Sequence, residues 1–119
     1  MAEIEQFVDS DGQQWVVLMG PDYVDGAKGQ ILLELSLRVL DKGIRHVVIN
    51  LEAARVVNSV GISRLIQMIE SFDEKGGSIA FCSVNSTISK TLRIMGLLNK
   101  AALYDSVESA AAQSGTESQ

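Results

Sequence analysis

Apolar and polar residues follow two kinds of pattern along this chain. Short apolar runs bounded by glycine, proline or polar turns are typical of strands. Longer segments with apolar residues three or four positions apart indicate amphipathic helices. The predicted strands are Ile4–Val8, Trp15–Met19, His46–Leu51, Ser78–Val84 and a short edge strand at 101–104. The predicted helices are Gln30–Lys42, Val60–Lys75, a third one over about 86–95, and a last one that ends near Ala112.

The order of these elements predicts the fold class. The first two strands are joined by the short polar turn Asp9–Gly12, which indicates an antiparallel hairpin. Later strands alternate with helices, and this order implies right-handed crossovers between parallel neighbours. We therefore expect one α/β domain over residues 1–112, with a mixed sheet of four or five strands and interspersed helices. Residues 113–119 are polar and are predicted to form a disordered tail.

The first predicted helix, Gln30–Lys42, is apolar over more than half of its circumference. Its polar residues form one narrow stripe, made of Gln30, Glu34, Arg38 and Asp41. A helix that packs on one sheet needs less apolar surface than this. We therefore expect a second contact, either with a neighbouring helix or with a partner subunit in a homodimer.

Composition and charge exclude several classes of function. The chain has 119 residues, of which 46% are hydrophobic and 21% charged, and its net charge is −5. This acidic balance argues against direct binding of nucleic acid or of anionic lipid, both of which require clustered cations. The amino terminus has no signal-peptide pattern, and no apolar run approaches the length of a membrane span. We expect a cytoplasmic protein without direct membrane insertion.

Candidate residues for metal binding and catalysis are few. The chain contains one histidine, His46, and one cysteine, Cys82, too few for a zinc site. Cys82 lies in an apolar run and is predicted to be a buried core residue. His46 begins a strand well before the nearest candidate nucleophile, and the GxSxG motif of hydrolases is absent. We therefore expect a non-enzymatic protein without a metal site.

The segment Val56–Gly61, which joins a predicted strand to a predicted helix, carries the main functional signal. It places Ser59 where the helix begins, a region in which backbone N–H groups lack partners and the helix dipole is positive. Asn58 and Ser59 are both favoured N-cap residues, so the first interpretation of the Ser59 hydroxyl is a structural cap. The second interpretation is an accessible phosphorylation site, and the third, a hydrolase nucleophile, lacks a base.

Phosphorylation of Ser59 is physically compatible with the predicted fold. A phosphate adds about −1.5 to −2 charges, which at a helix start meet unpaired N–H donors and a favourable dipole. The effect would therefore fall on a partner that docks over this helix end. Ser63 lies one turn further along the same face and is a second candidate acceptor, with an ordinary exposed serine as its alternative interpretation.

The chain resembles a known family, the STAS domain, and within it the bacterial anti-sigma factor antagonists. The resemblance covers most of the chain and depends on the order of four segments: His46–Leu51, Val57–Ile62, Lys75–Gly77 and Leu92–Leu97. Two departures are visible. Asn58 stands where the family often has aspartate, and Pro21 stands where it often has the acid of a Gly-acid-hydrophobic-Asp turn.

The resemblance implies a partner-switching regulator of transcription. Such an antagonist binds an anti-sigma factor that is also a serine kinase, is released when the kinase phosphorylates the serine matching Ser59, and is reset by a serine phosphatase. The residues expected to contact the partner are Asp22, Asp25, Asn58, Ser59, Val60, Gly61, Ser63 and Arg64. The alternative is a STAS subunit that serves as a signalling scaffold, or as a component of a membrane transporter, without a phosphorylation switch.

Overall fold

A five-stranded mixed sheet forms the centre of the computed structural model, which describes residues 5–113. Its strand order is β1-β2-β4-β6-β7. The strands are β1 (Glu5–Val8), β2 (Gln14–Met19), β4 (His46–Asn50), β6 (Ser78–Cys82) and β7 (Ala102–Tyr104). β1 pairs antiparallel with β2, and the remaining neighbours are parallel. The predicted α/β class, the initial hairpin and the mixed sheet are therefore confirmed.

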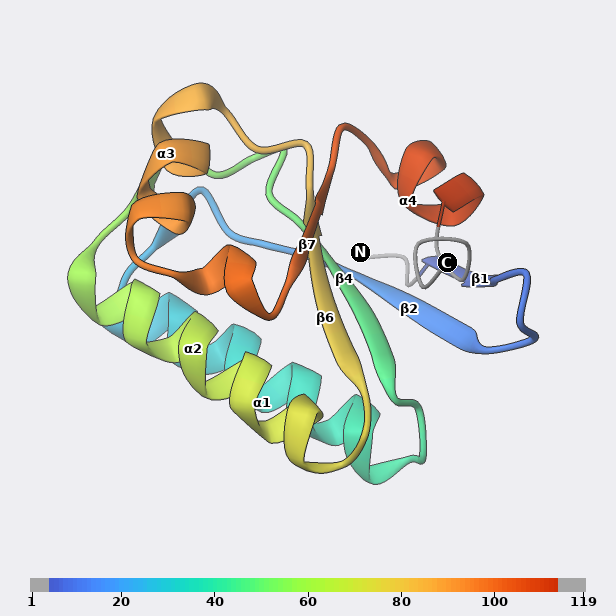
Figure 1. Ribbon diagram of the computed structural model, residues 1–119. Coiled ribbons are helices and arrows are strands. Elements are labelled where there is room, and N and C mark those ends of the chain that lie inside the picture. The colour runs from blue at the N-terminus through green and yellow to red at the C-terminus, as the bar shows by residue number, and fades with distance from the viewer. Residues whose placement is uncertain (1–4, 114–119) are drawn as a thin grey trace.

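Helices cover both faces of this sheet (Figure 1). They are α1 (Gly26–Asp41), α2 (Ser59–Glu74), α3 (Ser86–Ile94) and α4 (Val107–Gln113), with a short 3-10 helix, η1 (Leu97–Asn99), after α3. Helices α1, α2 and α3 share one hydrophobic core with the sheet, whereas α4 packs on the opposite face. Successive residues of β4 face opposite cores: Val47 contributes to the first core and Val48 to the second. This explains why the three central positions of the strand, Val47–Ile49, are all apolar.

Several helix boundaries differ from the prediction. Helices α1 and α2 each end one residue earlier than predicted, at Asp41 and Glu74. Helix α1 begins at Gly26, one turn before Gln30, because the Asp25 side chain caps it by accepting the Lys28 N–H at 2.8 Å. Helix α2 begins at Ser59 rather than Val60. Gln113, assigned to the tail, belongs to α4, and the rest of the predicted tail lies outside the described residues.

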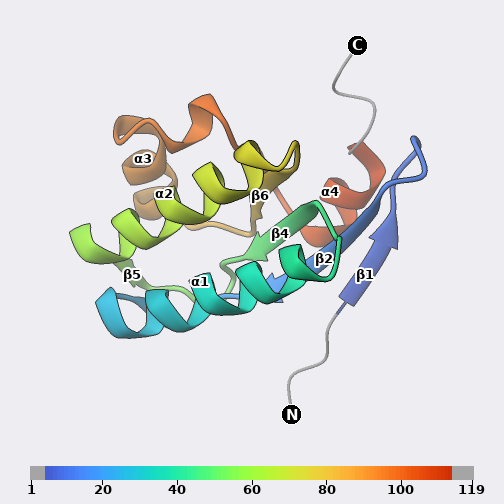
Figure 2. The same cartoon turned by 90° about the horizontal axis from the view of Figure 1, so that it is seen from below.

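The second contact predicted for α1 is with a neighbouring helix. α1 and α2 run side by side (Figure 2), and Leu32 and Leu33 of α1 belong to the same core as Leu65 of α2. On the outer side of α1, Ile31 and Leu35 stay exposed. The buried position predicted for Cys82 is also confirmed, and burial raises the pKa of its thiol.

The hairpin turn is held by one buried carboxylate, that of Asp9. It accepts hydrogen bonds from the Trp15 indole N–H at 2.7 Å and from the backbone N–H groups of Asp11 and Gln13, each at 2.9 Å. Burial alone would raise the pKa of Asp9, but these hydrogen bonds outweigh it and hold the pKa below its usual value. The ionised form therefore stabilises the fold. This contribution is complete above the unfolded-state pKa and is lost as the pH falls through the folded-state pKa.

We expect Asp9→Asn to lower the free energy of unfolding by about 1.5–3 kcal/mol at pH 7. The cost should be smaller at pH 3, below the usual pKa of an aspartate, because the unfolded wild-type chain binds a proton there and part of the stabilisation by the ionised carboxylate is lost. Urea unfolding of both proteins at the two pH values measures this. Asp11→Asn in the same turn is the control, because the Asp11 carboxylate accepts no hydrogen bond within residues 5–113. An equal cost of Asp9→Asn at both pH values would contradict the assignment.

Candidate functional site

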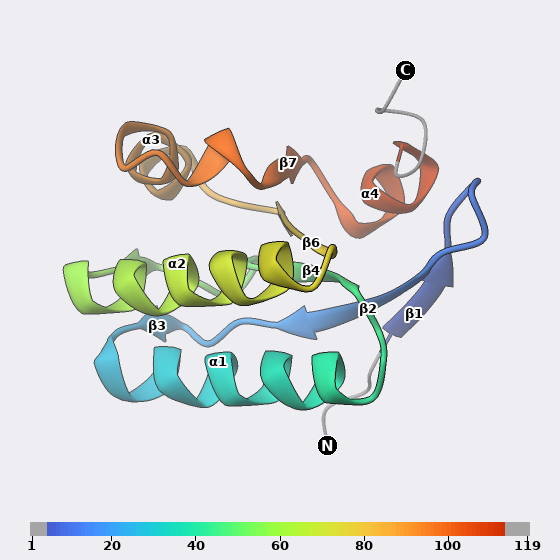
Figure 3. The same cartoon turned by 60° about the horizontal axis from the view of Figure 1, so that its bottom comes forward.

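Two short strands join segments that are distant in the sequence. β3 (Tyr23–Val24) pairs in parallel with β5 (Val56–Val57), and together they form a second, two-stranded sheet. Flanking backbone bonds extend the contact: the Arg55 N–H donates to the Asp22 carbonyl at 2.7 Å, and the Asn58 N–H donates to the Val24 carbonyl at 3.1 Å. The turn after β2 thus lies beside the start of α2 (Figure 3). The sequence did not predict either strand.

Glycine allows the start of α2 to lie directly against β3. A Cβ atom at Gly61 would lie 1.9 Å from the Val24 carbonyl oxygen, a distance that no side chain can occupy. Gly29 likewise allows α1 to lie close to α2, although less tightly, since a Cβ atom at Gly29 would lie 3.1 Å from Arg64 Cγ. Gly61 and Arg64 were both expected to contact a partner. Gly61 is buried beneath the surface, and Arg64 is half-buried between the helices, 3.5 Å from the Gly26 carbonyl.

Asn58, and not Ser59, is the N-cap of α2. Asn58 Oδ1 accepts the Gly61 N–H at 2.8 Å, and the Asn58 carbonyl accepts the Ile62 N–H at 2.9 Å. Ser59 is the first residue of the helix and is exposed. Within the described part of the chain, its hydroxyl makes no hydrogen bond; its carbonyl accepts one from the Ser63 hydroxyl at 3.3 Å. The interpretation of Ser59 as a structural cap is therefore wrong.

We expect Asn58→Ala to lower the free energy of unfolding by about 1 kcal/mol, the usual cost of losing an N-cap. Ser59→Ala should change it by less than about 0.5 kcal/mol, as for an exposed side chain without partners. Urea unfolding of the two variants beside the wild type measures both values. Equal costs at the two positions would show that the Ser59 hydroxyl also stabilises the helix start.

Exposed apolar side chains lie near Ser59 along the chain and across the β3–β5 pair. Tyr23 pairs with Val56, three residues before Ser59, and Val60 follows Ser59 directly; their exposed fractions are 44%, 49% and 46%. Grouped exposed apolar side chains often mark an interaction site. With the exposed Ser59 and Ser63, these three residues form what we call the Ser59 surface. Sequence reasoning did not single out Tyr23 and Val56. Only knowledge that β3 pairs with β5 would have identified these two residues, and strands of two residues leave no pattern in the sequence from which that pairing could be predicted.

Charged residues border the Ser59 surface. Asp22 accepts a hydrogen bond from Lys28 Nζ at 2.8 Å, and this ammonium also lies 5.7 Å from the centre of the Tyr23 ring. The bond with Lys28 lowers the pKa of Asp22, and the same bond raises the pKa of Lys28. Both side chains are exposed, so the pair is screened by water and orients the turn rather than stabilising the fold. The Asp25 carboxylate is occupied as the cap of α1.

The histidine of the chain, His46, makes no contact with Ser59 in the described structure. His46 lies at the amino end of β4, where its ring stacks on Trp15, and its Nδ1 lies 2.9 Å from the Ser78 hydroxyl. Burial lowers the pKa of His46. Among residues 5–113 there is no group of His, Cys, Asp and Glu side chains suited to hold a metal ion. The helices of this region also include none that is long and apolar enough to cross a membrane.

Among curated proteins, the chain is similar to the anti-sigma F factor antagonist of Paenibacillus polymyxa. The two sequences are 23% identical over 75 residues, which are 63% of this chain and 64% of the relative. The chain therefore spans less than two thirds of the length of that relative.

Comparison with solved structures shows that the fold is shared. An anti-sigma-factor antagonist (STAS) domain protein from Planctomyces limnophilus matches with a TM-score of 0.70 and 18% identity, over 93% of this chain and 96% of that one. The Bacillus cell fate determinant SpoIIAA in its phosphorylated form gives 0.59 and 13%, over 89% and 95%. A sulfate transporter family protein from Wolinella succinogenes gives 0.60 and 16%, over 80% and 81%.

The family model described as the STAS domain matches residues 13–110. This range begins just before β2 and ends within α4, so it contains the central parallel strands and the whole Ser59 surface. The chain therefore belongs to the STAS domain family.

Proposed function

We propose that this protein is an anti-sigma factor antagonist and that its docking surface is the Ser59 surface. The observation that carries the proposal is the division of roles at the start of α2. Asn58 supplies the cap, and Ser59 presents an exposed hydroxyl without a hydrogen-bond partner in the described structure. The name of the Paenibacillus polymyxa relative supports the same role.

The partner in this proposal is an anti-sigma factor with serine kinase activity. It docks in the cytoplasm over the exposed apolar residues Tyr23, Val56 and Val60 and transfers the terminal phosphoryl group of its own ATP to Ser59 Oγ. The hydroxyl proton is lost, ADP leaves, and the complex dissociates. A serine phosphatase reverses the step by hydrolysis. This chain contributes the acceptor and the docking surface, and it needs no cofactor of its own.

Phosphorylation can release the partner without refolding the antagonist. The backbone N–H groups of Ser59 and Val60 lie in the first turn of α2, at the positive end of the helix dipole, and this environment stabilises a dianionic group. The same charge, placed among the apolar side chains of an interface, is costly because the partner would bury it. The free antagonist therefore tolerates the modification and the complex does not.

The alternative is a STAS subunit that acts as a signalling scaffold or as a component of a membrane transporter. The fold likeness to the Wolinella succinogenes protein is the observation that keeps this alternative. It differs from the first proposal in one testable respect, because a scaffold or transporter subunit would bind its partner irrespective of the chemical state of Ser59.

A pull-down followed by a phosphorylation assay tests the proposal. Wild-type protein is used as bait in native lysate, the captured ATPase is identified by mass spectrometry and purified, and it is incubated with ATP and each variant. We expect phosphate on wild type and on Ser63→Ala, and none on Ser59→Ala. Phosphorylation of Ser59→Ala would move the acceptor elsewhere, and capture of a transporter ATPase without phosphorylation would favour the alternative.

A further inference from the structure

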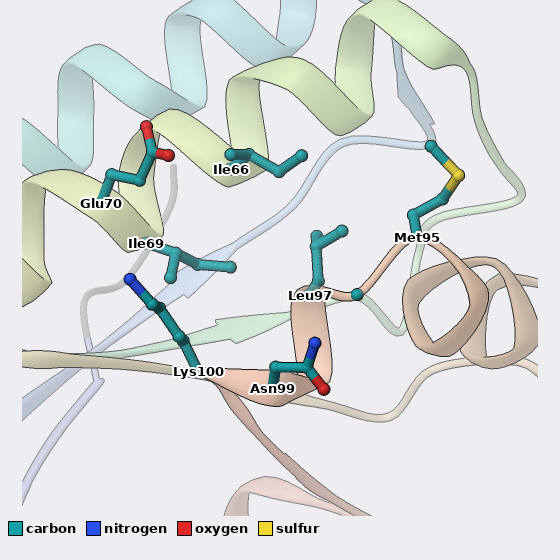
Figure 4. A pocket seen from close by; sticks show the side chains of 8 residues that line it. Ile66, Ile69, Glu70, Met95, Leu97, Asn99 and Lys100 are labelled. Atoms are coloured by element: carbon teal, nitrogen blue, oxygen red, sulfur yellow. The ribbon is translucent and has the colours of Figure 1, made fainter.

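A groove of about 230 Å³ lies between α2 and the segment that follows α3 (Figure 4). Its apolar lining comes from both sides, and one acidic and one basic side chain stand beside it. The residues concerned are Ile66, Ile69, Met95 and Leu97, with Glu70 and Lys100. Small-molecule sites are usually about 300–1,000 Å³, so this groove is better matched to a side chain presented by another protein.

The groove continues the Ser59 surface along α2. Ser59, Ser63, Ile66 and Glu70 follow one another at intervals of four, three and four residues, which places them on one face of the helix. A protein docked over Ser59 and lying along this face therefore reaches the groove within three turns.

The segment that follows β6 and forms one side of the groove carries an excess of cations, in contrast to the protein as a whole. Residues 83–104 contain three cations and no carboxylate, whereas the whole chain has a net charge of −5. Lys100 is 3.5 Å from Asp73, but Lys90 and Arg93 of α3 form no ion pair with any described residue. Beside them, Ile94 is 80% exposed and Met95 53% exposed. Unpaired cations next to exposed apolar side chains favour an acidic partner with apolar anchors.

We propose that this groove binds an acidic, amphipathic segment of the protein that docks over Ser59. One apolar side chain of that segment fills the space between Ile66, Met95 and Leu97, and its carboxylates face Lys90 and Arg93. The mode is that of a helix laid in a hydrophobic groove, with a buried anchor at its centre. The proposal rests on the proposed function, since it adds a second subsite to the same interface.

Two synthetic peptides test the groove without the natural partner. The first is an amphipathic helix of leucine and glutamate, and the second carries lysine in place of each glutamate. In methyl NMR spectra of the whole protein, we expect the acidic peptide to shift the Met95 methyl signal and to leave that of Met19 in place. The basic peptide should shift neither, although the net charge of −5 favours it overall. No shift with the acidic peptide, or equal shifts with both, would overturn the proposal.

Matched variants test the groove with the ATPase captured by the wild-type bait. We expect Met95→Ser to weaken binding at least about tenfold, and Met19→Ser, which changes a methionine of similar exposure (55%) on another face, to leave it within about twofold. Lys90→Glu with Arg93→Glu should weaken binding, and Arg38→Glu with Lys42→Glu should not. If Met95→Ser and the double variant Lys90→Glu with Arg93→Glu both bound with wild-type affinity, the groove proposal would be overturned and the Ser59 switch would stand. If both lost affinity while Ser59→Glu had no effect, the groove would stand and the Ser59 switch would be overturned.

Discussion

Replacing Gly61 with alanine is expected to lower the free energy of unfolding by about 3 kcal/mol or more, because the new methyl group meets backbone rather than a movable side chain. The Cβ atom would lie 1.9 Å from the Val24 carbonyl oxygen and 2.6 Å from its carbonyl carbon. Relief requires the start of α2 to move away from β3. That movement also breaks the bond from the Asn58 N–H to Val24, so the Ser59 surface changes with the fold.

Gly43→Ala is the control that separates crowding from backbone conformation. Gly43 has a φ of +91° and nothing within 4 Å of the Cβ position, so alanine there suffers conformational strain alone. We expect that strain to cost about 1–2 kcal/mol. Thermal and urea unfolding compare the two variants. If Gly61→Ala were no more destabilising than Gly43→Ala, α2 would have room to shift, and the tight contact with β3 would not be what positions Ser59.

The sequence predicted the elements that have their own periodic pattern. The apolar run that begins at His46 and the regular spacing of apolar residues after Ser59 are both visible in the sequence. They predicted a strand and a helix, and the structure has β4 and α2 at these places. The pattern failed where a boundary depends on a single polar contact. Gly26 and Gly29 give no helical signal, and the start of α1 is set by the Asp25 cap.

The candidate site was predicted only in part, because it is made by pairing across more than thirty residues. Asn58 and Ser59 are adjacent and chemically similar, so the sequence alone could not decide which one caps α2; the hydrogen bond from Gly61 decides it. Tyr23 and Val56 belong to strands of two residues, too short for any period to appear. The β3–β5 pairing brings Tyr23 and Val56 together near Ser59. These two residues are too far apart in the sequence for a local pattern to include both.

The same pairing explains why a modification at Ser59 should act on binding and not on folding. The contacts that hold the helix start are made by the Asn58 amide, the Gly61 backbone and Val24, and none of them involves the Ser59 side chain. Stability and the proposed recognition thus depend on different atoms of neighbouring residues. A negative charge can therefore be added to the Ser59 side chain without disturbing the cap.

Ser59→Glu is accordingly expected to keep or slightly raise the stability of the free protein while it weakens binding of the anti-sigma kinase at least about 100-fold. The acidic side chain gains about 0.3–1 kcal/mol from the helix dipole when exposed. In the complex it would be buried among Tyr23, Val56 and Val60 without a partner. Isothermal titration gives the affinity and thermal unfolding the stability.

Ser59→Gln separates the effect of charge from that of size, since glutamine has the shape of glutamate without its charge. We expect its affinity to lie within about tenfold of wild type, because an uncharged polar chain at an interface costs far less than a buried charge. If glutamine weakened binding as much as glutamate, the surface would be excluding bulk at Ser59, and a phosphate would act by its size. If glutamate bound as tightly as serine, the partner would not cover Ser59, and phosphorylation there could not release it.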